Sequence, residues 1–233
     1  MTDAARSPWQ LATAVAKRPE AASATTIVLR PERPLRHTAG QHVVVRLTAD
    51  DGYSASRAYS IASAPGGAPE FELGVQRLAD GEVSPFLCDD LEVGDTVEIR
   101  GPIGGFFTWV PGTPAVLVGG GSGVVPVMAM LRAARQTGYP HAHLVVSARA
   151  PADLFYAPEL LDQDDVTVVF SRAAGPGGRR AGRLADADLD ALPLTGVTAF
   201  VCGTSGFADH AARLLIARGM AATDIRIERF GAS

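Results

Sequence analysis

The chain has 233 residues, 47% hydrophobic and 20% charged, as expected for a globular protein with one large or two ordinary domains. Its net charge of −4 gives no indication of binding to nucleic acid or to an anionic membrane. No apolar run is long enough to span a bilayer, and Met1–Gln10 lack an apolar signal core, so the sequence predicts a cytoplasmic protein.

From Trp9 to about Phe107, short β-rich runs alternate with turn residues, which indicates an antiparallel barrel or sandwich. Five runs are expected to form strands: Thr25–Leu29, His42–Leu47, Arg57–Ser63, Glu70–Gln76 and Thr96–Arg100. One short helix is expected from Ser84 to Asp90, with Ser84 as its N-cap and Pro85 at the first helical position.

After Pro111 and Gly112, strands begin to alternate with helices, which indicates a doubly wound parallel sheet. Five strands are expected: Ala115–Val118, His143–Ser147, Val166–Phe170, Thr198–Val201 and Ile225–Arg229. Three helices are expected: Val125–Thr137, Asp153–Leu161 and Phe207–Arg218. We therefore predict a boundary near Pro111–Pro114, between a β domain of residues 1–111 and an α/β domain of residues 112–233.

The segment Arg57-Ala58-Tyr59-Ser60 carries a cation, an aromatic ring and a hydroxyl within one expected strand. An Arg fork suits a phosphate or pyrophosphate, and a Tyr face packs on a flat ring. Taken alone, the four residues are more typical of an ordinary surface strand.

Two glycine-rich segments follow strands of the α/β half. Gly119-Gly120-Gly121-Ser122-Gly123 lies at a strand-to-helix junction, where backbone N–H groups approach a phosphate, although a tight turn for close packing is the alternative. Cys202-Gly203-Thr204-Ser205-Gly206 follows the fourth strand, at the sheet edge where ligands of α/β proteins bind. A lone cysteine is more often a small buried apolar residue.

A third candidate is an Arg- and Gly-rich loop after the third strand of the α/β half. Its basic residues are Arg172, Arg179, Arg180 and Arg183, with Ser171 beside them. The loop is either an anion site or a solvated surface. The two cysteines and five histidines of the chain lack the number and spacing of a metal site, so no metal is predicted.

Several short motifs together resemble the ferredoxin–NADP reductase family, from about residue 9 to residue 230 and in the family's order. They are Arg57-Ala58-Tyr59-Ser60, Gly81-Glu82-Val83-Ser84, Gly101-Pro102-Ile103-Gly104, Gly119 to Pro126, Cys202-Gly203 and Glu228-Arg229-Phe230. The resemblance implies an N-terminal six-stranded antiparallel β-barrel that binds FAD. A doubly wound, parallel five-stranded α/β domain that binds a nicotinamide dinucleotide would follow it.

The resemblance implies that Arg57 holds the FAD pyrophosphate, that Tyr59 packs on the isoalloxazine and that Ser60 bonds near flavin N5. Phe230 would cover the other flavin face, although three further residues follow it here, where many relatives end at the aromatic residue. The implied FAD residues are Arg57, Ala58, Tyr59, Ser60, Gly81, Glu82, Val83, Ser84 and Phe230.

The resemblance also places Cys202 beside the nicotinamide C4, and Ser171-Arg172 where NADP-preferring members hold the 2′-phosphate. The implied nicotinamide-cofactor residues are Gly120, Gly121, Ser122, Gly123, Ser171, Arg172, Arg180, Cys202 and Gly203. The implied catalytic residues are Ser60, Cys202 and Glu228. We therefore predict NADPH as the preferred donor, with NADH as the alternative.

The resemblance implies a stand-alone FAD-dependent NAD(P)H oxidoreductase that passes electrons to a separate acceptor, such as a ferredoxin or an oxygenase component. Cys88 and Cys202 are the two cysteines of the chain, too few for the iron–sulfur domain that some relatives carry. Two alternatives remain: a free flavin or ferric reductase, and a non-catalytic electron-relay subunit. The sequence does not identify the acceptor. A ferredoxin-type partner would need a basic docking patch, but residues 1–111 carry ten Lys and Arg against fourteen Asp and Glu, so their composition indicates no such patch.

Overall fold

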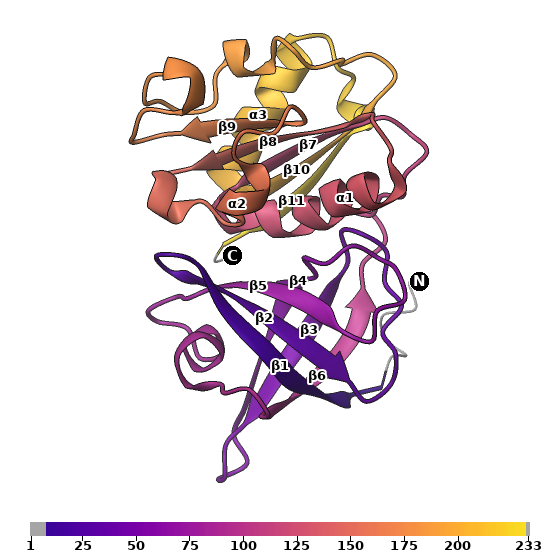
Figure 1. The fold of residues 1–233 in the computed structure, drawn as a ribbon, viewed down its shortest axis with the longest axis vertical. Coiled ribbons are helices and arrows are strands. Elements are labelled where there is room, and N and C mark those ends of the chain that lie inside the picture. Colours follow the sequence, from indigo (N-terminus) through magenta and orange to yellow (C-terminus); the bar gives the residue numbers. More distant parts are fainter. Residues whose placement is uncertain (1–7, 232–233) are drawn as a thin grey trace.

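In a computed structural model that describes residues 8–231, the first half of the chain forms a six-stranded antiparallel sheet (Figure 1). Its strands are β1 (Gln10–Ala21), β2 (Ala24–Pro31), β3 (His42–Thr48), β4 (Ser54–Ser60), β5 (Phe71–Gln76) and β6 (Thr96–Ile103). They lie in the order β4-β3-β6-β1-β2-β5. The two edges meet just after β4, where Ile61 bridges to Leu73 and the Ala62 N–H donates to the Glu72 carbonyl at 2.7 Å. The predicted six-stranded antiparallel barrel is confirmed.

The sequence missed β1, which is rich in alanine, a residue of low β propensity. Ala12 and Ala14 of β1 are nonetheless buried in the barrel core, so tertiary packing decides the conformation here. The helix expected from Ser84 is present as a tight turn, η2 (Phe86–Asp90), but Ser84 does not cap it. Its hydroxyl instead accepts from the Leu78 N–H at 3.1 Å, so the predicted N-cap is wrong.

The second half forms a five-stranded parallel sheet in the order β11-β10-β7-β8-β9. Its strands are β7 (Ala115–Gly120), β8 (Ala142–Ala148), β9 (Val166–Phe170), β10 (Thr198–Thr204) and β11 (Ile225–Phe230). Helix α1 (Val124–Thr137) covers one face and α3 (Ser205–Ala217) the other, as Figure 1 shows. The side chains of β7 are buried on both faces of the sheet, since Leu117 packs in the cluster with α1 while Val116 and Val118 pack in the cluster with α3. The doubly wound sheet is confirmed.

The helix expected over Asp153–Leu161 is reduced to α2 (Ala157–Leu160). Pro158 fits only the first turn of a helix, so the helix starts late, and Tyr156 before it has a left-handed φ of +57°. The other helical turns are η3 (Gly121–Gly123), η4 (Pro151–Asp153), η5 (Pro176–Gly178), η6 (Asp186–Leu189) and η7 (Ala222–Asp224). None of the helices within residues 8–231 has the length and apolar character needed to cross a bilayer.

Helix α1 lies between the parallel sheet and the barrel (Figure 1). One apolar cluster joins its buried side chains to Ala24, Ala39 and Ala62 of the barrel half. The predicted boundary near Pro111–Pro114 lies between the end of β6 and the start of β7 and stays a prediction, as does the division at residue 111. Part of the Met1–Gln10 segment and the residues Ala232 and Ser233 lie outside the described chain.

Gly74 of β5 lies where the barrel packs directly on the α/β half. A Cβ there would lie 2.6 Å from Val125 Cγ2 and would also meet the Tyr156 hydroxyl. We expect Gly74→Ala to lower the free energy of unfolding by about 1–3 kcal/mol, because overpacking forces both halves to shift. Urea denaturation measures this. The control is Gly105→Ala, where an added Cβ meets nothing within 4 Å. Equal effects of the two substitutions would contradict the close contact.

Candidate functional site

A cleft of about 580 Å³ lies at the carboxyl edge of the parallel sheet. The barrel half supplies one wall through Ala21, Ser23 and Gln76. The α/β half supplies the remaining lining residues: Gly120, Gly121, Ser122, Ser147, Ala148, Arg149, Asp153, Phe155, Ser171, Arg172, Arg183, Leu184, Thr204, Gly206, Phe207 and His210. The cleft therefore lies where the two halves meet, and the Ala22 N–H of the β1–β2 hairpin donates to the Ala152 carbonyl across this junction at 2.9 Å.

The glycine loop after β7 is fixed by packing as well as open to the cleft. A Cβ on Gly120 would lie 2.5 Å from the Phe207 ring, and a Cβ on Gly123 would meet the Cys202 carbonyl. Gly121 is different, because nothing lies within 4 Å of an added Cβ and its φ is +56°. The close-packing reading therefore holds for Gly120 and Gly123, while Gly121 and Ser122 line the cleft and keep the phosphate reading as a prediction.

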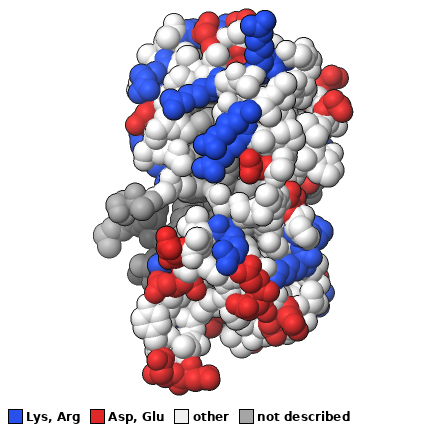
Figure 2. Space-filling model, turned by 90° about the vertical axis from the view of Figure 1, so that its left-hand side faces the viewer, with Lys and Arg blue, Asp and Glu red and all other residues white. Residues whose placement is uncertain are grey.

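Arg149, Arg172 and Arg183 line the cleft, and Figure 2 shows Lys and Arg gathered over the α/β half of one face. Arg179 has another role. Its guanidinium forms a bidentate pair with Asp188 at 2.6 and 2.7 Å and donates to three loop carbonyls, which holds the Arg-rich loop in shape. Arg180 is not among the residues that line the cleft within the described chain, so its predicted role has no support from the cleft's shape.

The sequence did not single out three polar residues of the cleft: Arg149, Asp153 and His210. Arg149 directly follows β8, and the ends of parallel strands meet at one sheet edge, so its position offered a usable signal. His210 lies on α3. Its Nε2 pairs with the Leu184 carbonyl at 2.7 Å, so it does have a structural bond while it lines the cleft.

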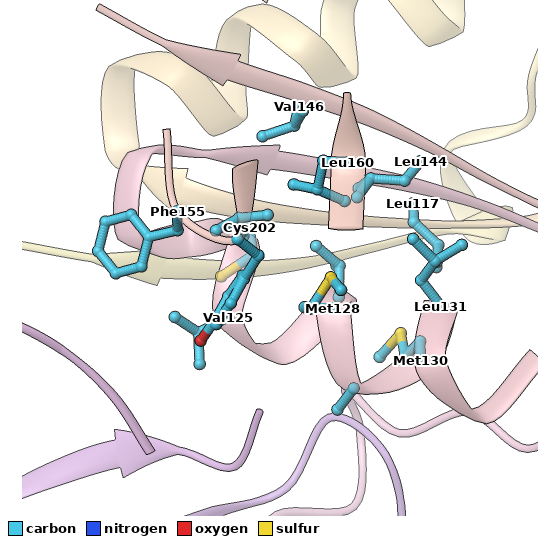
Figure 3. Packing of buried hydrophobic residues seen from close by; sticks show 14 of the residues in the cluster. Leu117, Val125, Met128, Met130, Leu131, Leu144, Val146, Phe155, Leu160 and Cys202 are labelled. Carbon is cyan, nitrogen blue, oxygen red and sulfur yellow. The ribbon is translucent and has the colours of Figure 1, made fainter. Parts of the chain in front are cut away.

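Cys202 and Glu228 lie side by side, as register partners in β10 and β11. Cys202 has no exposed surface, and Figure 3 shows it within the apolar cluster between the sheet and α1. Burial, and then the neighbouring Glu228 carboxylate, raises the pKa of the Cys202 thiol well above its ordinary value. Burial also raises the pKa of the Glu228 carboxyl from 4.5 to about 7. The pair therefore holds a neutral thiol beside a carboxyl group that titrates near neutral pH.

Phe230 closes β11, opposite Thr204 of β10, and its half-buried ring packs against the same apolar cluster as Cys202. Gly203 lies beside Cys202, where an added Cβ would lie 2.6 Å from the Phe207 ring. The structure thus brings Cys202, Gly203, Glu228 and Phe230 together at one end of neighbouring strands.

On the barrel, Arg57 and Tyr53 converge on the Glu82 carboxylate. Arg57 donates to it at 2.7 Å, and the Tyr53 hydroxyl donates to the same group. These hydrogen bonds hold the pKa of the Glu82 carboxyl below its ordinary value, and the bond from Tyr53 has the larger effect. Tyr59 is half-buried, and burial raises the pKa of its hydroxyl, while Ser60 is buried at the end of β4. The structure therefore places the expected Arg57–Ser60 and Gly81–Ser84 segments side by side.

The turn Gly81–Ser84 is anchored in the barrel. Val83 is fully buried, and an added Cβ on Gly81 would lie 2.8 Å from the Ser84 hydroxyl. A second hollow, of about 480 Å³, lies beside this turn and includes Tyr53 and Glu82 in its wall. Backbone N–H groups at a helix start and an Arg fork suit a phosphate group, and a Tyr ring suits a flat ring. Together they suit a phosphate-bearing ligand with a flat ring.

Residues 20–108 match a family model described as "Oxidoreductase FAD-binding domain". The chain is 32% identical over 203 residues to the ferredoxin reductase component of 3-ketosteroid-9-alpha-monooxygenase from Mycolicibacterium smegmatis, with coverage of 84% of this chain and 56% of the relative. It is 33% identical over 196 residues to the ferredoxin–NAD(P)(+) reductase component of the naphthalene 1,2-dioxygenase/salicylate 5-hydroxylase systems of a Ralstonia species, with coverage of 80% and 58%. The chain thus spans little more than half the length of these relatives.

Among solved structures, the fold is similar to the flavohem-like FAD/NAD binding domain of nitric oxide dioxygenase from Vibrio cholerae. The TM-score is 0.87 and the identity 26%, with coverage of 97% of this chain and 100% of that one. The similarity therefore includes both halves of the chain and the junction between them.

The raised pKa of Glu228 predicts how stability depends on pH. The folded protein keeps the carboxyl proton up to about pH 7, whereas the unfolded chain loses it near 4.5, so the contribution of Glu228 to stability falls as pH rises between these values. We expect Glu228→Gln to be more stable than the wild type above pH 7, with the difference shrinking towards pH 5. Thermal unfolding at several pH values measures this, with Glu32→Gln, which removes an exposed carboxylate, as control. Parallel pH curves for the wild type and Glu228→Gln would contradict it.

Proposed function

We propose, because the chain belongs to the ferredoxin–NADP reductase family, that it takes hydride from NADPH onto FAD and passes electrons to a separate acceptor. The observation that carries this proposal is the cleft between the barrel and the α/β half. It combines an exposed glycine turn, at Gly121 and Ser122, with the guanidinium groups of Arg149, Arg172 and Arg183. Phosphate groups of a dinucleotide need such backbone donors and cations.

The nicotinamide cofactor would be held along the carboxyl edge of the sheet. Gly121 and Ser122 would meet its diphosphate at the start of α1, where the helix dipole favours an anion. Arg172, with Ser171, would hold the 2′-phosphate of NADPH, and Arg183 lies in the same wall as a second cation. A guanidinium fork binds a phosphate monoester better than it binds a ribose hydroxyl. This favours NADPH over NADH.

FAD would be held on the barrel. Arg57 would bind its pyrophosphate together with the backbone of Glu82, Val83 and Ser84, and Tyr59 would pack on the flavin ring. The hollow beside Tyr53 and Glu82 offers room for the adenosine end of the cofactor. Glu82 now occupies the Arg57 fork, so we infer that its carboxylate turns away or shares the guanidinium when a pyrophosphate binds.

When bound, FAD accepts a hydride and releases electrons singly or in pairs, which is chemistry that the side chains cannot supply. The chain's task is to bring the two rings together and to exclude water. Ser60 would orient the flavin edge, and Phe230 would cover the ring until the nicotinamide replaces it. Cys202 would stay a neutral thiol beside Glu228, and Glu228 would supply or accept a proton near neutral pH.

The acceptor would be a separate protein of the ferredoxin or oxygenase-component class, in line with the names of the relatives above. Figure 2 shows Asp and Glu gathered over the barrel half of one face, and residues 1–111 contain fourteen acidic against ten basic residues. A partner with a basic docking face would be favoured by this charge. A cytoplasmic location stays a prediction.

A free flavin reductase is the second candidate function, and the exposure of Arg57 favours it, because an exposed fork holds a ligand weakly. Gel filtration of the FAD-loaded protein separates the two candidates. Retained flavin absorption indicates a bound cofactor, whereas flavin that elutes with small molecules indicates a substrate.

The proposed function is tested by mixing the FAD-loaded protein anaerobically with NADPH and, separately, with NADH. We expect NADPH to bleach the oxidised-flavin band at least about tenfold faster than NADH, because the phosphate contact contributes roughly 1.5–3 kcal/mol. Stopped-flow absorbance measures both rates. Equal rates would remove the phosphate pocket but keep the reductase, while a protein that takes up no FAD would overturn the proposal.

The role of individual arginines is tested by comparing four alanine variants. Arg172→Ala and Arg183→Ala are expected to raise the KM for NADPH about tenfold and to leave the KM for NADH within about twofold, since only NADPH loses a charged contact. Arg180→Ala is expected to have little effect, because the described cleft does not include Arg180. The control is Arg213→Ala, an exposed residue of α3. A selective loss in Arg180→Ala alone would contradict the assignment of the 2′-phosphate to the arginines that line the cleft.

A further inference from the structure

Arg132 of α1 makes hydrogen bonds to both halves of the molecule. On the barrel side it donates to the Ala62 carbonyl at 3.0 Å and to Glu72 of β5 at 2.8 Å. On the α/β side it donates to both carboxylate oxygens of Glu159 in α2. One guanidinium therefore joins a strand of the barrel, the segment after β4 and two helices of the α/β half.

The surroundings of Arg132 make these contacts firmer than those of a surface ion pair. Its side chain is 17% exposed, and its guanidinium lies over the Tyr156 ring at 4.8 Å. Glu72 is shared with Arg18, which donates to its other oxygen at 2.7 Å. Burial alone raises the pKa of the Glu72 carboxyl, but the two arginines outweigh it and hold that pKa below its ordinary value. The carboxylate thus stays charged at neutral pH and is bonded from both sides.

The two ends of this link lead directly to the two candidate binding segments. Ala62 lies two residues after Ser60, the last residue of the Arg57–Ser60 segment, and its N–H donates to the Glu72 carbonyl to close the barrel. Helix α1 starts directly after the η3 turn Gly121–Gly123, which lies at the cleft. At 1.5 Å per residue, Arg132 lies about 12 Å along the helix from Val124.

We propose that Arg132 is a positioning residue that fixes the end of the flavin-binding strand relative to the glycine loop, and so sets the spacing of the two rings for hydride transfer. This inference rests on the proposed function. Hydride transfer requires donor and acceptor atoms about 3–3.5 Å apart, and a 1 Å misplacement costs about 100-fold in rate. The apolar contact between α1 and the barrel is not directional by itself. The bonds of Arg132 to one carbonyl and two carboxylates supply the missing direction.

The chain offers a matched control one turn further along the same helix. Arg135 donates to Asp165 at 2.6 and 2.8 Å and to the Glu159 carbonyl at 3.0 Å, all within the α/β half. Arg135→Met therefore removes a similar set of bonds from α1 without touching the barrel. Arg132→Met removes the bonds that cross between the halves.

The test compares wild type, Arg132→Met and Arg135→Met as full-length, FAD-loaded proteins. The readouts are FAD content, the Kd for NADP⁺, the limiting rate of flavin bleaching at saturating NADPH, and the long-wavelength charge-transfer absorbance of stacked rings. We expect Arg132→Met to lower the limiting rate about 10- to 100-fold and to weaken the charge-transfer band, with FAD content and Kd within about twofold of wild type. Arg135→Met is expected to keep the wild-type rate, and Arg132→Lys to recover part of the loss.

Equal rates for Arg132→Met and Arg135→Met, or a change in Kd alone, would overturn the positioning role. If Arg132→Met does not fold, Glu72→Gln replaces it, because it weakens the same link from the barrel side. Hydrogen exchange of the full chain without added cofactor is a readout independent of the reaction. Faster exchange at residues 59–64 is expected in Arg132→Met and not in Arg135→Met, and no difference would reject the link. If the wild type itself is not bleached by either nucleotide, the proposed function fails, while the exchange comparison still decides whether Arg132 holds this segment.

Discussion

The packing of α1 between the parallel sheet and the barrel is the constraint on which both candidate binding surfaces depend. The helix buries apolar side chains on both sides, among them Val125, Met128 and Met130 (Figure 3). A helix that is apolar nearly all round cannot face water, so the barrel is needed to cover it. The cleft follows from this contact, because the hairpin residues Ala21 and Ser23 then reach the carboxyl edge of the sheet.

The glycine loop after β7 is likewise fixed by packing. Gly120 and Gly123 have no room for a side chain, because Phe207 and the Cys202 carbonyl fill that space. The loop is therefore held against β10 by contacts of the chain itself, and its exposed part, Gly121 and Ser122, does not have to be ordered by a ligand. A preformed phosphate site saves the entropy that a flexible loop would lose on binding.

Sequence patterns predicted both sheets, because continuous apolar runs and regular turns depend mainly on local chemistry. They failed where tertiary contacts decide: β1 is a strand because Ala12 and Ala14 fill the barrel core, and α2 is short because of Pro158. The motifs identified Arg172, which lines the cleft, and Arg57, which pairs with Glu82 at the wall of the barrel hollow. Sequence alone could not separate Arg179, which holds its own loop through Asp188, from arginines that line the cleft. Nor could it identify contributions from the barrel hairpin, since these arise from the docking of two distant segments.

Two arginine–carboxylate pairs differ in burial, and this difference suits one to ligand binding and the other to positioning. In the Arg57–Glu82 pair the side chains are 53% and 44% exposed, and solvent screens such a pair strongly, so an anionic ligand could replace the carboxylate at little cost. Arg132 and Glu72 are 17% and 21% exposed and have further partners on both sides, so removal of one member would leave a charge in a half-buried site. The first pair is therefore suited to exchange with a ligand. The second is suited to hold the end of β4, the strand that carries Arg57, because Arg132 also donates to the Ala62 carbonyl just after that strand.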